Sequence, residues 1–228
     1  METALKIFGF LGILAVSFNA SGCSVHVNSH GDGPSVSGSG IVKEEVRQVS
    51  GFTGVTLAGS GKVEIDFNGK EGVTVSAEDN ILPLLTTNVE KGILVLGTKD
   101  NTSISTNKDI VYKISAKTIS SLSLDGSGSI MAKNLKLDAL KTEISGSGNI
   151  ELAGTANSLN INVSGSGSFD STKVAAKDAV VDVAGSGSVN VDASGTLKVD
   201  ITGSGSVQYK GDPKIMQSVV GSGSVRKL

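Results

Sequence analysis

Few residues in this sequence of 228 residues carry the side chains on which catalysis or metal binding usually depends. It contains one cysteine, Cys23, two histidines, His26 and His30, and no tryptophan. The histidines, with Asp32 nearby, are ligand types of a zinc site, but no third and fourth ligand follow at a fixed spacing. We therefore expect no metal site, no cofactor and no catalytic residue, and the sequence predicts a protein that is not an enzyme.

Carboxylates are the remaining groups with catalytic potential. A polysaccharide hydrolase needs two carboxylates that face each other across the scissile bond, and a lyase needs a base with cationic or Ca²⁺-binding groups on one face. Asp182 and Asp200 each precede a Gly-Ser-Gly tripeptide by three residues, so they can stack one repeat apart. Apart from phenylalanines, only Tyr112 and Tyr209 could stack on a sugar ring. A polysaccharide-processing enzyme is therefore kept as an alternative.

The lone cysteine follows an apolar N-terminal run. Residues 7–18 form 12 consecutive positions of apolar character behind Lys6, whereas a membrane-spanning helix needs about 20. Small residues at 20–22 lead directly into Cys23, an arrangement that resembles the lipobox of bacterial lipoproteins. We expect a signal peptide at 1–22 and a lipidated Cys23 that holds the protein on a membrane. An ordinary secretory peptide that leaves a free thiol is the alternative.

The segment that follows has the composition of a tether. Residues 23–41 are rich in serine, glycine, asparagine and aspartate, which cannot bury enough apolar surface to fold, so we expect flexibility. Ser24 stands where an acidic residue directs some lipoproteins to the inner membrane, which favours the outer membrane, on its surface or periplasmic side. The net charge of -2 leaves no excess of cations to bind nucleic acid.

The rest of the chain is a repeat. The tripeptide Gly-Ser-Gly occurs eight times, beginning at positions 38, 59, 126, 146, 165, 185, 203 and 221. From position 126 onward the spacings are 20, 19, 20, 18 and 18 residues. Such a period is typical of a structural repeat, whereas a Gly-Ser linker lacks regular flanking sequence.

Side chains alternate in character on both sides of each tripeptide. In one repeat the valines share the parity of the two glycines, and polar residues take the other parity; the valines are Val181, Val183, Val189 and Val191. Each repeat therefore reads as a strand, a glycine-marked bend and a second strand, with the glycines on the inner face. The second half of each repeat is less regular, and its expected inward residues are Leu135, Leu137, Leu159, Val174 and Leu197.

A unit of 18–20 residues fits one coil of a β-solenoid and is too short for a propeller blade of about 40 residues. Coils stacked at about 4.8 Å would align equivalent residues. Val163, Val183 and Ile201 are expected to form an interior column. The exterior ladder is expected to consist of Ser147, Ser166, Ser186, Ser204 and Ser222. The sequence thus predicts an all-β solenoid.

The interval of 67 residues from the start of the tripeptide at 59 to the start of the tripeptide at 126 is less regular. Strand-like runs lie at 72–77, 93–98 and 109–116, and 80–90 has the pattern of a short helical turn with Pro83 in its first turn. We expect degenerate coils with one small helix here.

Three segments carry a family resemblance: RQVSGFTGVTLAGSGKVEID at 47–66, AEDNILPLLTTNVEKGILVLGTK at 77–99 and SLSLDGSGSI at 121–130. Together with the serial Gly-Ser-Gly bends, they resemble the putative auto-transporter adhesin head GIN domain of bacterial envelope lipoproteins. The resemblance covers 42–228 and implies a right-handed parallel β-helix, similar in architecture to pectate lyases. The family offers no established catalytic residues, and fold alone does not give function.

Three functions remain open. The first is a non-enzymatic, lipid-anchored envelope protein that acts as an adhesin or binding module for a surface glycan or an envelope protein. The second is the polysaccharide-processing enzyme. The third is a periplasmic interaction module that binds a protein along an exposed strand edge, although Arg226 and Lys227 would guard that edge and favour a monomer.

Overall fold

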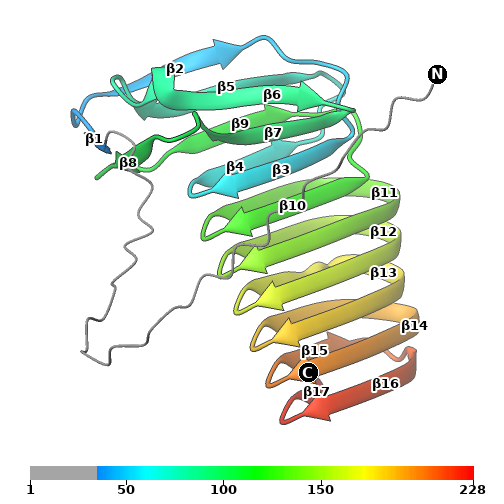
Figure 1. The fold of residues 1–228 in the computed structure, drawn as a ribbon. Coiled ribbons are helices and arrows are strands. Elements are labelled where there is room, and N and C mark those ends of the chain that lie inside the picture. Colours follow the sequence, from blue (N-terminus) through cyan, green and yellow to red (C-terminus); the bar gives the residue numbers. More distant parts are fainter. Residues whose placement is uncertain (1–34) are drawn as a thin grey trace, which may run out of the picture. The chain divides into compact units, whose positions relative to one another are not determined.

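Residues 35–228 are described by a computed structural model, and most of them lie in strands that stack as coils (Figure 1). The predicted signal peptide and Cys23 lie outside the described residues. No helix within 35–228 is long and apolar enough to span a membrane. The elements are β1 (Ser35–Ser37), β2 (Val42–Arg47), β3 (Gly54–Gly59), β4 (Lys62–Asp66), β5 (Gly72–Glu78), the 3-10 helix η1 (Leu82–Leu84), β6 (Leu85–Glu90), β7 (Ile93–Thr98), β8 (Ser103–Ser105), β9 (Val111–Ser115), β10 (Ser121–Gly126), β11 (Ser129–Gly146), β12 (Asn149–Gly165), β13 (Ser168–Gly185), β14 (Ser188–Gly203), β15 (Ser206–Lys210), β16 (Lys214–Gly221) and β17 (Ser224–Lys227).

Each coil crosses two walls that meet at a Gly-Ser-Gly corner. We call the wall that runs into the corner the leading wall; it contains β7, β3, β10, the C-terminal parts of β11–β14, and β16. The trailing wall leaves the corner and contains β9, β4, the N-terminal parts of β11–β14, β15 and β17. All these neighbours pair in parallel, so the predicted right-handed parallel β-helix is confirmed, with about 5 turns.

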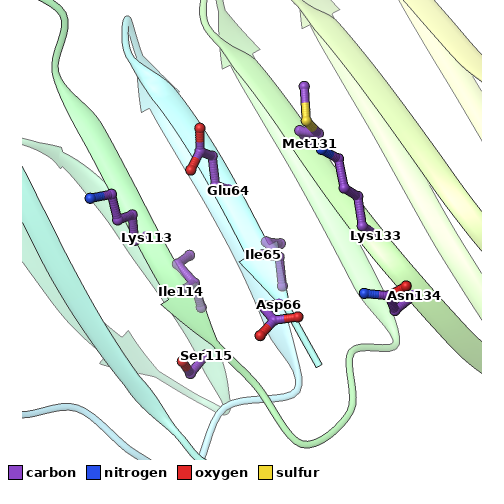
Figure 2. A pocket seen from close by; sticks show the side chains of 9 residues that line it. All are labelled: Glu64, Ile65, Asp66, Lys113, Ile114, Ser115, Met131, Lys133 and Asn134. Atoms are coloured by element: carbon purple, nitrogen blue, oxygen red, sulfur yellow. The ribbon is translucent and has the colours of Figure 1, made fainter. Parts of the chain in front are cut away.

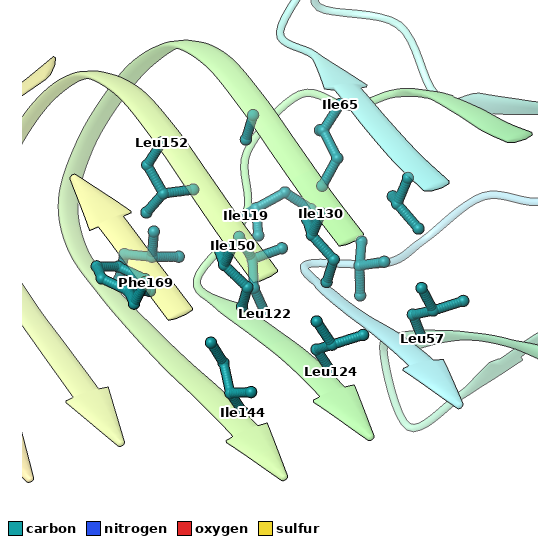
Figure 3. Close-up of a cluster of buried hydrophobic side chains, with 14 of the residues drawn as sticks. Leu57, Ile65, Ile119, Leu122, Leu124, Ile130, Ile144, Ile150, Leu152 and Phe169 are labelled. Carbon is teal, nitrogen blue, oxygen red and sulfur yellow. The ribbon is translucent and has the colours of Figure 1, made fainter. Parts of the chain in front are cut away.

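The core lies between the two walls and consists of the residues that share the parity of the corner glycines (Figure 3). The predicted column is confirmed, because Val163 pairs with Val183 and Val183 with Ile201, and all three are buried. Phe169 fills the space between walls in one coil where other coils carry isoleucine or valine. The less regular inward residues are also placed correctly: Leu135, Leu159, Val174 and Leu197 are buried, and Leu137 is partly buried.

The corner requires glycine because coils approach each other there through backbone atoms. Gly185 has φ +118°, and a Cβ at this position would lie 2.6 Å from the carbonyl oxygen of Gly165 in the preceding coil. The Ser186 N–H donates to that same oxygen at 2.8 Å. The close approach therefore supports the hydrogen bond that joins successive corners.

The N-terminal end of the solenoid is closed by antiparallel strands. β5 pairs antiparallel with β2 and β9, and β6 pairs antiparallel with β7. Phe52, Ile81 and Leu82 are buried beneath this cap. In the region where we expected degenerate coils, β7 and β9 continue the two walls in parallel, while β5 and β6 add antiparallel strands that form the cap. The helical turn expected over 80–90 is confined to η1.

Residues 35–41, which we expected in the tether, contact the cap; we call them the strap. β1 pairs with β8, and the Gly40 N–H donates to the Glu78 carboxylate at 2.7 Å. Glu78 is only 1% exposed and also accepts the Thr106 hydroxyl. A Cβ on Gly38 would collide with this carboxylate. Glycine is therefore required in the first Gly-Ser-Gly tripeptide by the Glu78 side chain, whereas at the coil corners it is required by the backbone of the preceding coil.

Candidate functional site

The outer surface of the trailing wall presents side chains in straight rows. Because successive coils keep one register, each outward position recurs at about one strand spacing, near 4.8 Å. From β11 onward the first outward row after the corner consists of hydroxyl and amide side chains: Ser129, Asn149, Ser168, Ser188, Ser206 and Ser224. Lys62 of β4 and Val111 of β9 precede them in this row. Within it the Ser188 hydroxyl donates to Ser168 Oγ at 3.3 Å. Next to this row runs the predicted serine ladder at the corner, whose members are exposed.

A second outward row lies two residues further along each strand and carries more charge. Its members are Glu64, Met131, Glu151, Asp170, Asn190, Gln208 and Arg226. The Lys173 ammonium lies 2.8 Å from the Glu151 carboxylate, and this hydrogen bond and charge raise the pKa of Lys173. The wall therefore offers both hydrogen-bond acceptors and donors, with acidic residues towards the N-terminal coils and Arg226 in the last coil.

This wall carries a groove of about 350 Å³ (Figure 2). Glu64 and Asp66 of β4 lie along its middle, between Lys113 of β9 and Lys133 of β11. Lys113 is engaged by Glu44 at 2.9 Å, which raises the pKa of Lys113. Among the described residues, neither Glu64 nor Asp66 has an ion-pair partner, so both carboxylates are free to accept hydrogen bonds from a ligand.

One rim of the groove is made by an irregularity that the repeat pattern did not reveal. The pairing of β11 with β12 shifts between Ala132 and Leu135, and Asn134 adopts φ +60° there. The extra backbone brings Lys133 and Asn134 to the side of the groove. The available signal was the length of this repeat, 20 residues before a repeat of 19, combined with an asparagine, which tolerates positive φ.

The leading wall brings the predicted carboxylate pair together. Asp182 and Asp200 are register partners in β13 and β14, as expected from their spacing. They lie in a shallow hollow of about 230 Å³ lined only by residues of β11–β14 on this wall. The Lys198 ammonium lies 2.7 Å from Asp200, which raises the pKa of Lys198. Both carboxylates therefore project side by side from one wall, without facing each other across a cleft as a hydrolase requires.

The other candidate residues are placed as follows. Tyr112, considered as a sugar-stacking residue, is 1% exposed in the core, and burial raises its pKa to about 12. Tyr209 takes an inward register and is partly buried. Within 35–228 no three His, Cys, Asp or Glu side chains gather in a way that could hold a metal ion. The two histidines lie outside the described residues.

The sequence was compared with protein families and curated proteins, and the fold with solved structures. Residues 51–213 match the family described as "Putative auto-transporter adhesin, head GIN domain". No curated protein matches the chain.

Three solved structures share the fold. A putative adhesin from Bacteroides fragilis has a TM-score of 0.70 at 21% identity, covering 85% of this chain and 100% of its own. A putative lipid binding protein from Parabacteroides distasonis has a TM-score of 0.59 at 24% identity, covering 86% and 100%. A putative adhesin from the same organism has a TM-score of 0.52 at 20% identity, with the same coverage. At these identities the likeness shows the fold alone.

Proposed function

Because this chain belongs to the putative auto-transporter adhesin head GIN domain family, we propose that it is a non-enzymatic, lipid-anchored envelope protein that binds a glycan along its trailing wall. The observation that carries this proposal is the set of register-locked polar rows beside a groove with two unpaired carboxylates. A glycan is a chain of hydroxyl groups that both donate and accept hydrogen bonds. Rows of serine, amide and carboxylate groups at a fixed spacing are complementary to such a chain.

The groove provides the orientation for this binding. The carboxylates of Glu64 and Asp66 accept hydrogen bonds from sugar hydroxyls, while Lys133 and Asn134 donate to ring and hydroxyl oxygens. The single contacts are weak because these side chains are exposed, so affinity would come from several contacts made along one polymer. The absence of exposed aromatic residues at the groove favours extended binding over tight capture of a single sugar.

Binding is supported over cleavage by the position of the acidic groups. Catalysis by two carboxylates needs them on both sides of the scissile bond. In the groove and in the leading-wall hollow the acidic side chains project from one surface. This arrangement suits hydrogen bonding to a polymer that lies on the wall.

The binding test uses the purified full chain on an array of bacterial and host glycans. The double variant Glu64→Gln/Asp66→Asn keeps the shape of both exposed side chains but removes their charge, and we expect apparent affinity to fall at least about tenfold. Asp125→Asn is the matched control, since Asp125 is exposed on the leading wall. Equal binding by wild type and both variants, or binding by none of them, would refute the glycan proposal.

Anchoring and orientation are tested separately. Replacing Cys23 with alanine should release the protein from the membrane fraction, because the acyl chains would have no attachment site. Protease sensitivity of the solenoid on intact cells would support a surface adhesin. Protection until the outer membrane is permeabilised would instead favour a periplasmic partner, and retention of the Cys23→Ala protein on membranes would contradict the lipid anchor.

A further inference from the structure

Within residues 35–228 the two ends of the solenoid differ, since antiparallel strands close the N-terminal end and no described strand covers the last coil. The last coil consists of β16 and β17, each paired on one side only, with β14 and β15 respectively (Figure 1). Its inward residue Val219 is 38% exposed at the end of the core, and the outward residue Met216 is 50% exposed. An unpaired parallel edge with apolar side chains is a surface that proteins normally cover or guard.

The direction of the free hydrogen-bonding groups follows from the earlier coils. Outward residues bond backward, as when the Lys141 N–H donates to the Ser120 carbonyl of the preceding coil at 3.0 Å. β16 keeps this register, with Met216 opposite Lys198. Since N–H and C=O groups alternate in direction along a strand, the inward residues Ile215, Gln217 and Val219 direct theirs to the open side.

These residues make β16 complementary to itself. We propose that two copies of this chain associate tail to tail, with β16 pairing antiparallel to β16 of the second copy about a two-fold axis at Gln217. This register places Ile215 opposite Val219 of the other copy, with each pair exchanging N–H···O=C bonds. It also sets the two Gln217 amides against each other. Gln217 holds the inward register of Val199, a position occupied by Val181 and Ile161 in the preceding coils and by Thr142 before them. The Gln217 amide of the second copy supplies the matching donor and acceptor.

The second wall is compatible with the same axis. The strands of the two walls run in opposite directions, so a two-fold axis passing from one wall to the other reverses both and brings β17 antiparallel to its copy. Lys227 occupies the inward register of Tyr209, and its ammonium pairs with Asp212, which raises the pKa of Lys227. In this proposal the ion pair balances the charge of Lys227 at the interface, whereas the sequence predicts that Arg226 and Lys227 guard this edge and favour a monomer.

The N-terminal end is not a suitable partner for this surface. Lys43, Glu45 and Arg47 of β2 pair with inward residues of β5 and therefore share their face. β2 extends the trailing wall, because it pairs with β5 and β5 pairs with β9, so in a head-to-tail stack these charges would meet β17 and its inward residues Val225 and Lys227. Inward-pointing charges of this kind prevent edge pairing, so the geometry favours a closed tail-to-tail dimer over an open filament.

Cysteine cross-linking tests the register directly. In the full chain, whose natural cysteine is Cys23, Gln217→Cys would place two Cα atoms about 5.5 Å apart across the axis, within the disulfide range of about 4.4–6.8 Å. Ser218→Cys is the matched control, because its copies lie diagonally about 7–8 Å apart. We expect Gln217→Cys to form a disulfide dimer in oxidised membranes at least about tenfold faster than Ser218→Cys or the parent. Equal rates would overturn the proposed register.

Mass measurement tests the association itself. Gln217→Lys places two ammonium groups against each other at the axis and should weaken the dimer at least about 100-fold. Gln208→Lys makes the same substitution at an exposed outward position in β15 and should leave the dimer intact. Because both glutamines are exposed in the single chain, neither substitution disturbs the fold. A monomeric wild type in sedimentation equilibrium, or a Gln217→Lys protein that remains dimeric, would overturn the proposal.

Discussion

Alanine at a corner glycine should destabilise the solenoid by an amount that depends on whether a coil lies in front of it. Gly59 and Gly185 have nearly the same backbone conformation, with φ of +113° and +118°. A Cβ at Gly59 has no neighbouring heavy atom within 4 Å, whereas a Cβ at Gly185 lies 2.6 Å from the Gly165 oxygen. Comparing Gly59→Ala with Gly185→Ala therefore separates backbone strain from the clash between coils.

The two contributions have different sizes. Positive φ in an alanine costs about 1–3 kcal/mol, and both variants carry this cost. Forcing a methyl group into the packed corner at Gly185 adds about 2 kcal/mol, since the coils must separate or the backbone must shift. For a domain of this size about 2 kcal/mol corresponds to roughly 4–8 °C in Tm. Gly185→Ala should therefore melt that much below Gly59→Ala.

Thermal unfolding followed by circular dichroism at the strand band measures both variants beside wild type. Urea unfolding provides an independent ranking, because repeat proteins can lose two-state behaviour. If the two variants melt within about 1 °C of each other, the close approach of coils is not what selects glycine at the corner. A Gly59→Ala protein less stable than Gly185→Ala would contradict the reasoning even more directly.

Three further outcomes are expected. Burial raises the pKa of Tyr112 from 10.0 to about 12, so the free energy of unfolding should fall by up to about 2–3 kcal/mol as pH rises from 10 to 12. Tyr112→Phe should lose less stability over this range, and an identical loss in alkaline unfolding would contradict this expectation. The hydroxyl of Thr196 lowers the pKa of Asp178, so the ionised Asp178 carboxylate stabilises the fold above pH 3.8 and this stabilisation is lost on acidification. Asp178→Asn should therefore lower Tm at pH 7 but not at pH 2. An equal fall in Tm at both pH values would argue against this role of Asp178. Glu78→Ala should leave the Gly40 N–H without its acceptor and destabilise the domain by about 1–3 kcal/mol. Amide hydrogen exchange in residues 35–41 should become faster. Unchanged exchange would show that Glu78 does not hold the strap.

The repeated part of the fold could be predicted because its signals are local. Alternation with a period of two fixed which side chains face inward, and the spacing of the tripeptides fixed which residues align between coils. Val163, Val183 and Ile201 are placed correctly for this reason, and so is the stacked pair Asp182 and Asp200. The partner of each strand is simply the same strand one repeat away, so no long-range choice remained to be made.

The cap and the strap could not be predicted because their partners are not set by the repeat. Nothing in β5 alone indicates that it pairs antiparallel with both β2 and β9. In the 80–90 segment, Ile81, Leu84 and Leu85 have helical spacing, while Leu85 and Val89 also fit a strand. Pairing with β7 decides in favour of the strand for Leu85–Glu90. The groove was missed because it depends on a shift in pairing of β11 and on side chains from three strands.

The capped end gives the molecule a direction that its repeated coils lack. A parallel coil has no hydrogen-bonding partner within itself, so it can form only against a coil that already exists. Strands β6 and β7 are separated by two residues and form an antiparallel hairpin, so they can assemble without a preformed coil. They belong to the part of the chain that is synthesised before the regular coils. We therefore expect this hairpin to act as a seed, and the coils to be added one at a time in the order in which the ribosome delivers them.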